Sequence, residues 1–314
     1  MNILITGGCG YIGTNLTNSL LDLGHHITVV DIMWFGNYLH PHENLDVIQA
    51  DIRDIDKIPM DGVDTIIHLA NIANDPTGDL NARLTWEVNV LASKFLIEKA
   101  IEKGVKKFIF ASSGSVYGVK EELQVTEDLS LVPISVYNKT KMVSERIFLS
   151  YKDNIIIHCI RPATVCGFSQ RMRLDLSVNM LTAQAIKNKK ITVFGGNQVR
   201  PNINIKDMIR VYQHFVANRD IPSGCYNAGF ENISILDIAL LVKDKIPSEI
   251  IITESNDPRS YRLCSEKLEK TGFERSYSVE DAIKDMIAKF ESGEIKDTPQ
   301  SYTVDWMKKL NLHE

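Results

Sequence analysis

Short apolar runs alternate with longer amphipathic segments through the first half of the chain. The apolar runs are rich in β-branched and aromatic residues, which predicts strands at residues 2–6, 27–31, 46–50, 65–69, 107–112 and 154–160. Between several of them, apolar residues recur with helical spacing near residues 14–23, 80–103 and 136–151. Strands that alternate with helices favour a parallel sheet covered on both faces, and the mostly continuous apolar strands agree with burial on both sides. The pattern therefore predicts an α/β fold.

The alternation becomes less regular after residue 161. Further strands are predicted at residues 191–194, 202–205 and 250–253, and further helices near residues 176–187, 206–217, 234–245 and 279–290. We interpret residues 1–165 as a sheet domain, to which part of 202–230 returns. A smaller lobe beside it would comprise residues 166–201 and 231–291. Residues 292–314 are predicted to form a polar C-terminal tail, which Trp306 and Leu310 could dock.

Composition and charge argue against several classes of protein. The 314 residues carry a net charge of −5, which provides no basic surface for nucleic acid. No run of about 18 apolar residues occurs, and the chain opens on a predicted strand without the basic segment of a signal peptide, so no membrane attachment is expected. The five cysteines are scattered and include no CxxC pair, so neither a disulfide framework nor a metal site is expected. A reducing, cytoplasmic location fits this cysteine usage.

A glycine-rich turn follows the first predicted strand and opens the first predicted helix. Gly7, Gly10 and Gly13 give the spacing GxxGxxG, which differs from the GxGxxG of the usual dinucleotide fingerprint. Glycines allow positive φ angles and close approach of the backbone to a ligand. The free N–H groups and the positive dipole end of a helix N-terminus suit a diphosphate. The turn alone is also compatible with a purely structural role.

Asp31 ends the second predicted strand, eighteen residues after Gly13. A carboxylate at that position can accept hydrogen bonds from the ribose hydroxyls of NAD, and it would repel the 2′-phosphate of NADP. Residues 31–52 contain no Lys or Arg that could receive such a phosphate. Although a solvated Asp at a strand end is the alternative, the position and the missing cations favour NAD.

Tyr137 and Lys141 lie four residues apart on a predicted helix and so share one face. A cation beside a phenol stabilises the phenolate and is expected to lower the pKa of Tyr137, which would make it a usable base near neutral pH. Ser113, twenty-four residues before Tyr137, could hydrogen-bond the oxygen that gains or loses the proton. Such Tyr-x-x-x-Lys pairs also occur by chance on exposed helices, but the serine-rich strand end before this one argues against chance.

Taken in order, these motifs resemble the extended short-chain dehydrogenase/reductase family, specifically its nucleotide-sugar epimerase and dehydratase branch. The matching positions are residues 6–13, 31, 51–52, 68–70, 89, 112–118, 137–141 and 161–162, with 200–201, 206–207 and 257–262 in the C-terminal part. The resemblance implies a Rossmann-like, doubly wound parallel sheet that holds NAD. It also implies a smaller C-terminal α/β lobe that holds a nucleoside-diphosphate sugar.

The resemblance further implies roles for individual residues. Catalysis would rest on Ser113, Tyr137 and Lys141. The residues that would bind NAD are Gly7, Gly10, Tyr11, Ile12, Gly13, Asp31, Asp51, Ile52, Leu69, Ala70, Asn71, Ser112, Tyr137, Lys141 and Pro162. Those that would bind the substrate are Ser113, Thr164, Asn179, Arg200 and Arg259. Cys166 is interpreted as a residue that shapes the pocket, whereas Arg171 and Arg173 could reach the substrate or be solvated loop charges.

Within this branch the sequence favours a reaction that stays at sugar C4. A 4,6-dehydratase typically has an Asp-Glu pair directly after the Ser113 position, where this chain has Gly114 and Ser115, and the Cys of the related 3,5-epimerases is also missing there. We therefore expect an NAD-dependent nucleotide-sugar 4-epimerase that acts through a 4-keto intermediate. A one-way C4 dehydrogenase or 4-ketoreductase with tightly bound NAD(H) stays open. A 4,6-dehydratase or a non-catalytic NAD-binding protein is less favoured.

The same resemblance bears on assembly. The predicted helices near residues 80–103 and 136–151 match those that relatives pair into a dimeric four-helix bundle, so a homodimer is expected. The alternative is that the apolar positions of these helices all face the sheet.

Overall fold

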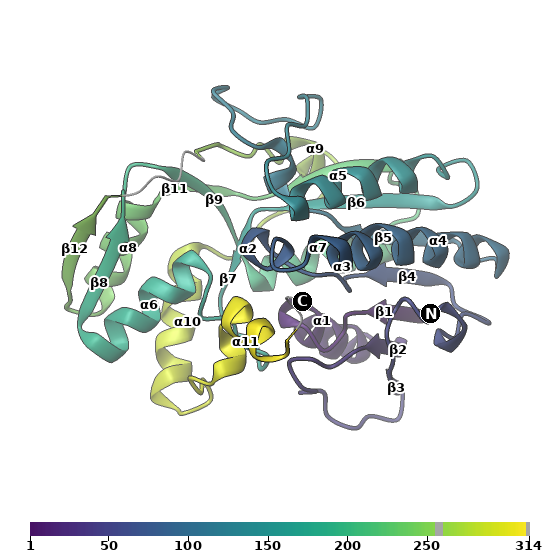
Figure 1. Ribbon diagram of the computed structural model, residues 1–314, viewed down its shortest axis with the longest axis horizontal. Coiled ribbons are helices and arrows are strands. Elements are labelled where there is room, and N and C mark those ends of the chain that lie inside the picture. The colour runs from purple at the N-terminus through teal and green to yellow at the C-terminus, as the bar shows by residue number, and fades with distance from the viewer. Residues whose placement is uncertain (255–259, 312–314) are drawn as a thin grey trace.

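The apolar runs of the first half form one parallel sheet. The computed structural model describes residues 1–254 and 260–311. Its central sheet has seven parallel strands in the order β10-β6-β5-β4-β1-β2-β3 (Figure 1). The strands are β1 (Asn2–Thr6), β2 (His26–Asp31), β3 (Leu45–Gln49), β4 (Thr65–His68), β5 (Lys107–Ala111), β6 (Ile156–Pro162) and β10 (Gly224–Ala228). The predicted α/β fold of the Rossmann type is confirmed, with β10 as a strand that the sequence analysis did not predict.

Each face of the sheet carries its own core, because successive side chains of a strand point to opposite faces. On β1, Ile3 and Ile5 belong to one buried cluster and Leu4 to another. Helices α1 (Tyr11–Asp22) and α7 (Ile205–Ala217) contact each other and pack on the first face. Helices α4 (Ser93–Glu102) and α5 (Val136–Leu149) contact each other and pack on the second face.

The long helix predicted at residues 80–103 is divided into three parts. These are α3 (Ala82–Trp86), a π-helical turn at Glu87–Ala92, and α4. Asn89 lies in the π-helical turn with its side chain buried, accepting a hydrogen bond from the N–H of Ile72 and donating to the Thr140 hydroxyl. The turn thereby ties the chain after β4 to α5, and π-helical turns occur frequently at functional sites.

The second half of the chain forms two small sheets beside the large one. β11 (Glu231–Ser234), β9 (Val199–Asn204) and β7 (Thr164–Cys166) form a three-stranded sheet, while β8 (Lys190–Phe194) pairs with β12 (Glu249–Thr253). Helices α6 (Ser177–Asn188), α8 (Ile235–Lys245) and α10 (Val279–Glu291) enclose a third core with β8. Figure 1 shows this lobe to the left of the central sheet. β7 and β11 were not predicted from the sequence.

Three further short helices complete the description. They are α2 (Asp75–Gly78), α9 (Glu266–Glu269) and α11 (Thr303–Lys309). The last lies in the predicted tail, and its Trp306 donates an indole N–H hydrogen bond of 2.7 Å to the carbonyl of Trp34. Within residues 1–254 and 260–311, no helix is both long and apolar enough to cross a membrane.

Candidate active site

A cavity of about 580 Å³ opens at the carboxyl ends of the central strands. Its walls come from segments at the ends of six parallel strands, β1 to β6, together with residues of the second half of the chain. The carboxyl edge of a doubly wound sheet is where such folds bind ligands. The volume lies in the range of small-molecule sites. The cavity is therefore the place to look for the predicted residues.

The glycine turn between β1 and α1 forms one wall of the cavity. Gly7 has φ +76°, and a Cβ there would meet the backbone N of Ala70 at 2.6 Å. A Cβ on Gly13 would lie 2.3 Å from the Gly7 carbonyl oxygen. The N-cap residue of α1 is Gly10, which has no side chain to cap the helix, so the first N–H groups are available to a ligand. The turn is thus a close-packed cradle that fits a diphosphate at a helix N-terminus.

Asp31 ends β2 and also lines the cavity. One carboxylate oxygen accepts the N–H of Cys9 at 2.9 Å, and the other accepts the N–H of Met33 at 2.7 Å. Burial raises the pKa of Asp31, while these backbone hydrogen bonds and the charge of Arg171 oppose the rise. The carboxylate is held in place with acceptor capacity left over, as the predicted contact with ribose hydroxyls requires.

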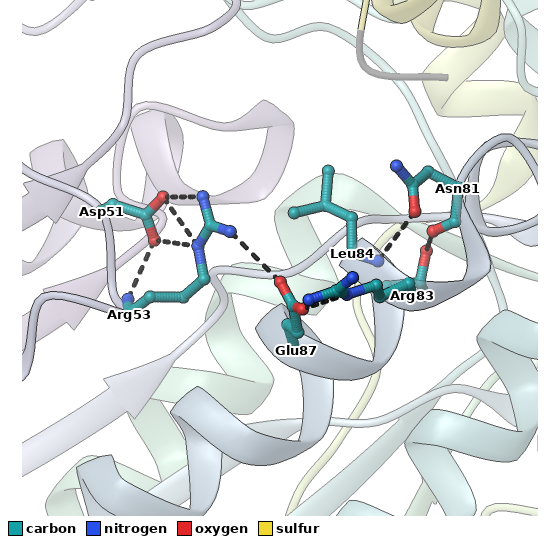
Figure 2. A network of polar contacts seen from close by, with 7 residues as sticks. Asp51, Arg53, Asn81, Arg83, Leu84 and Glu87 are labelled. Carbon is teal, nitrogen blue, oxygen red and sulfur yellow. Dashed lines mark hydrogen bonds and ion pairs between the residues drawn. The ribbon is translucent and has the colours of Figure 1, made fainter. Parts of the chain in front are cut away.

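Asp51 and Ile52, both predicted to bind NAD, follow β3 and line the cavity. Arg53 pairs with the Asp51 carboxylate, with Nη2–Oδ2 at 2.7 Å, and its Nη1 lies 3.4 Å from Glu87 Oε2. Figure 2 shows these contacts. Arg83 contacts the other oxygen of Glu87 at 2.9 Å. Burial would raise the pKa of Asp51, but the hydrogen bonds and charge of Arg53 bring it below its ordinary value. The network fixes an anionic acceptor at this part of the cavity wall.

Tyr137 and Lys141 project from α5 into the cavity beside Ser113. The Lys141 Nζ lies 5.6 Å from the centroid of the Tyr137 ring and donates to the Ala111 carbonyl at 2.6 Å. Burial lowers the pKa of Lys141 to about 7, against a raising effect of the Glu145 charge. The structure therefore brings the three predicted catalytic residues together.

The pKa of Tyr137 departs in the direction opposite to the one predicted from the sequence. Burial of the phenol raises its pKa, and the negative charge of Asp75 adds to the rise. The hydrogen bond with Ser113 and the charge of Arg173 oppose it. The prediction considered only the neighbouring cation, whereas desolvation disfavours the phenolate more strongly here.

Ser113 belongs to a short chain of hydrogen bonds at the end of β5. Its Oγ lies 2.7 Å from the Oγ of Ser115, which in turn donates to the side-chain oxygen of the buried Asn138. The neighbouring Ser112 also lines the cavity and donates to Glu145 at 2.5 Å. The Ser113 hydroxyl is also hydrogen-bonded to Tyr137, so these contacts hold it beside the phenol.

The remaining predicted cofactor residues also lie on this cavity. The lining includes Gly10, Tyr11, Ile12, Leu69, Ala70, Asn71 and Pro162. Tyr11, at the start of α1, donates its hydroxyl hydrogen to the Gly167 carbonyl at 2.7 Å. That bond joins the glycine turn to the second half of the chain, so the two halves share the cavity wall.

The predicted substrate residues divide into three groups. Thr164 and Arg200 line the cavity. Asn179 does not line it, because its buried amide bonds the Tyr11 hydroxyl at 3.0 Å and the N–H of Gly167 at 2.9 Å. Arg259 lies outside the described residues. Cys166, predicted to shape the pocket, instead lies fully buried in the core of the lobe and contacts the Ile203 carbonyl.

Several lining residues were not predicted. Asp75 enters from the chain after β4 and accepts a hydrogen bond of 2.5 Å from Ser135, and Tyr261 enters from the C-terminal part. Thr303 and Met307 of α11 also reach the cavity. The sequence signal for Asp75 was the run Asn-Asp-Pro, which is typical of a helix start. The sequence around it does not predict that this helix start lies beside Tyr137.

Known proteins share this architecture. A sequence profile described as the NAD dependent epimerase/dehydratase family matches residues 3–229. A UDP-glucose 4-epimerase of Halalkalibacterium halodurans is 27% identical over 318 residues, covering 90% of this chain and 94% of that protein. UDP-glucuronic acid decarboxylase 1 of Danio rerio is 28% identical over 306 residues, covering 92% of this chain and 72% of that protein.

A similar solved structure contains both a cofactor and a nucleotide sugar. The UDP-glucuronic acid 4-epimerase from Bacillus cereus, in complex with UDP-glucuronic acid and NAD, has a TM-score of 0.82 and 26% sequence identity. The superposition covers 93% of this chain and 99% of that one. Relatives of nearly equal identity thus bear the names of different reactions, so the reaction has to be argued from the residues in the cavity.

Proposed function

The chain belongs to the NAD dependent epimerase/dehydratase family, and from this premise we propose that it is a nucleotide-sugar 4-epimerase acting through a 4-keto intermediate. The family consists of NAD-dependent enzymes that act on nucleotide sugars. One observation carries the finer assignment: Ser113, Tyr137 and Lys141 meet in the cavity of the glycine turn, and the positions after Ser113 hold Gly114 and Ser115.

Each of these residues has a task that follows from its contacts. Bound NAD supplies the hydride acceptor and donor at sugar C4. Tyr137 takes the proton of the C4 hydroxyl and later returns it, while Ser113 donates a hydrogen bond to the same oxygen. Lys141, when protonated, stabilises the Tyr137 phenolate, with its Nζ 5.6 Å from the centroid of the Tyr137 ring. Rotation of the 4-keto intermediate within the cavity then presents the opposite face of C4 to the returning hydride.

The surroundings of Gly114 and Ser115 support a reaction without dehydration. A Cβ on Gly114 would lie 3.1 Å from the Pro162 carbonyl oxygen, tighter than ordinary contact. The Ser115 hydroxyl is already engaged with Ser113 and Asn138. A carboxylate pair cannot enter at these positions without displacing that arrangement, which disfavours a 4,6-dehydratase.

The second candidate is a one-way C4 dehydrogenase or 4-ketoreductase, which would use the same three residues. A non-catalytic NAD-binding protein is the third, and the assembled set of Ser113, Tyr137 and Lys141 argues against it. The reactions differ in their products, because epimerisation conserves mass and redox state whereas net oxidation lowers the product mass by two.

The test is a product analysis on purified protein. The bound cofactor is identified first, and UDP-, GDP-, CDP- and dTDP-sugars are then incubated while absorbance near 340 nm and product mass are followed. Epimerisation predicts a new sugar isomer of unchanged mass without lasting NADH. Lasting NADH with a product two mass units lighter would replace the proposal with a C4 dehydrogenase. Turnover that survives in Tyr137→Phe would overturn the acid/base role.

We further propose that Arg200 binds the diphosphate of the nucleotide sugar. It lines the cavity from β9, and an Arg side chain offers a planar fork of donors that suits phosphate oxygens. Arg200→Ala should weaken binding of UDP-sugars about tenfold or more and spare NAD, as measured by calorimetry. Unchanged UDP-sugar affinity would remove Arg200 from the site.

A homodimer through the outer face of α4 and α5 is also proposed. Leu91 and Phe95 are 50% and 52% exposed, so these apolar side chains of the helical layer do not face the sheet. Exposed apolar side chains on one face favour association. Light scattering at several concentrations should give twice the mass of 35.4 kDa, and Phe95→Glu should give the monomer. A wild-type monomer at every concentration would reject the dimer.

A further inference from the structure

Arg171 is a buried cation on the wall of the cofactor cavity, to which the sequence assigned no definite role. It lies in the chain between β7 and α6, and only 5% of its surface is exposed. Its guanidinium centre lies 4.0 Å from the centroid of the Phe35 ring, in the chain that follows β2. The second half of the chain thus delivers a positive charge to the end of β2, within a stretch that contains no Lys or Arg of its own.

The guanidinium is poorly satisfied by the protein. Nη1 donates to the Met172 carbonyl and Nη2 to the Thr303 hydroxyl, both at the long distance of 3.4 Å. Nε is buried and has no hydrogen-bond partner among the described residues. By contrast, the equally buried Arg161 holds both oxygens of Glu145 at 2.9 and 2.8 Å. A buried cation that lacks a paired anion is costly unless a ligand supplies one.

The groups whose pKa values respond to the Arg171 charge show which part of the cavity lies near it. Its charge acts to lower the pKa of Asp31 at the end of β2 and that of Tyr11 at the start of α1. Burial and the nearby Arg173 lower the pKa of Arg171 itself to about 9, so it stays protonated at neutral pH. Arg171 is therefore close enough to the predicted ribose contact and to the start of α1 to interact electrostatically with groups at both.

Helix α11 contributes to the same part of the cavity wall. Its first residue, Thr303, accepts the Arg171 Nη2 hydrogen bond and donates its backbone N–H to Asp175 at 3.1 Å. Trp306 donates to the Trp34 carbonyl, one residue before Phe35. Arg171 is therefore clamped between α11 and the chain after β2, which excludes water from its charge and strengthens any contact with an anion.

We propose that Arg171 binds the diphosphate of NAD from the side opposite the N-terminus of α1. Two observations support the cofactor over the nucleotide sugar as the source of that diphosphate: the stacking on Phe35 and the coupling to Asp31 and Tyr11. The planar fork, with Nε free and two weakly held Nη groups, suits phosphate oxygens. The inference rests on the NAD site and not on which sugar reaction follows.

The test is calorimetric binding of NAD, and separately of UDP, to cofactor-stripped protein. Arg171→Met keeps the aliphatic stem on Phe35 and removes the charge, and Arg171→Gln is the second variant should the first fail to fold. Arg219→Gln, an exposed arginine, is the matched control. The expected result is an NAD Kd about 10- to 100-fold weaker for either Arg171 variant, with UDP affinity within about twofold and no change in the control.

A second readout separates this role from a structural one. Because the charge is poorly paired before NAD binds, Arg171→Met should leave the melting temperature of the cofactor-stripped protein unchanged or higher, while the rise in melting temperature on adding NAD shrinks. An NAD Kd within twofold of wild type would overturn the proposal. Weakened UDP binding with unchanged NAD binding would overturn it as well, since Arg171 would then serve the nucleotide sugar.

Discussion

The ion pair between Glu145 and Arg161 is buried directly behind the proposed catalytic groups. Its side chains are 2% and 5% exposed, and two parallel hydrogen bonds of 2.9 and 2.8 Å join them. Glu145 also accepts from Ser112, and Arg161 donates to the Tyr117 hydroxyl at 2.7 Å. Glu145 lies one helical turn after Lys141 on α5, so the pair anchors the helix that carries the proposed acid/base residue.

We predict that Glu145→Gln strongly destabilises the protein, because it leaves the Arg161 charge buried without an anion. Removing one partner of a buried pair costs about 3–5 kcal/mol. The entropy of unfolding, about 2.1 cal/mol/K per residue, is roughly 0.7 kcal/mol/K for 314 residues. The two figures together give a fall in melting temperature of about 4–7 °C.

The measurement is denaturant and thermal unfolding of cofactor-stripped protein at pH 7. The matched control is Glu98→Gln, because Glu98 pairs with Lys94 at 2.7 Å while both side chains are 39% exposed. Such surface pairs contribute less than about 1 kcal/mol. A second control, Glu145→Leu with Arg161→Met, removes both charges and should recover much of the loss. The reasoning fails if Glu145→Gln costs no more than Glu98→Gln.

Three further predictions concern the cavity. Because the Asp75 charge raises the pKa of Tyr137, Asp75→Asn should shift the rising limb of the pH profile of kcat/KM to lower pH; an unmoved limb would contradict the coupling. The folded-state pKa of Lys141, about 7, lies below its unfolded value of about 10.4, so between pH 7 and 10 the unfolded chain binds more protons and stability rises with pH. Cofactor-stripped Lys141→Met should lose up to about 1.4 kcal/mol of that rise per pH unit, and an identical pH dependence of its denaturant midpoint would disprove the assignment. Arg53 fixes the position of the Asp51 carboxylate, so Arg53→Gln should weaken NAD binding about fivefold without affecting UDP binding. Equal NAD affinity in calorimetry would show that Asp51 does not need Arg53 to hold it.

The elements of the sheet domain could be predicted because their signals are local. Residues 27–31 and 46–50 were predicted strands, and the structure has β2 at His26–Asp31 and β3 at Leu45–Gln49. The ends of such elements shift by a residue or two, but the face that each side chain presents follows from the strand or helix repeat. The spacing of Tyr137 and Lys141 is of this kind, and it placed both on one side of α5.

The strands that the sequence did not predict are short and depend on a partner strand. β7 has three residues, and β11 and β10 have four and five. Unlike the predicted strands, none of them contains a continuous run of β-branched and aromatic apolar residues, so their pairing is decided by the neighbouring strand. The π-helical turn at Glu87–Ala92 likewise depends on contacts of Asn89 with Ile72 and Thr140, which lie in other segments.

The sequence by itself determined the parallel sheet, the glycine turn and the candidate set of Ser113, Tyr137 and Lys141, since all of these rest on residues near one another in the chain. Only the tertiary structure decided what approaches that set from elsewhere. Arg171 stacks on Phe35 from 136 positions away, and Asn179 holds Tyr11 where a substrate contact was predicted. The sign of the Tyr137 pKa shift was decided in the same way, because burial is a property of the folded chain and no local pattern records it.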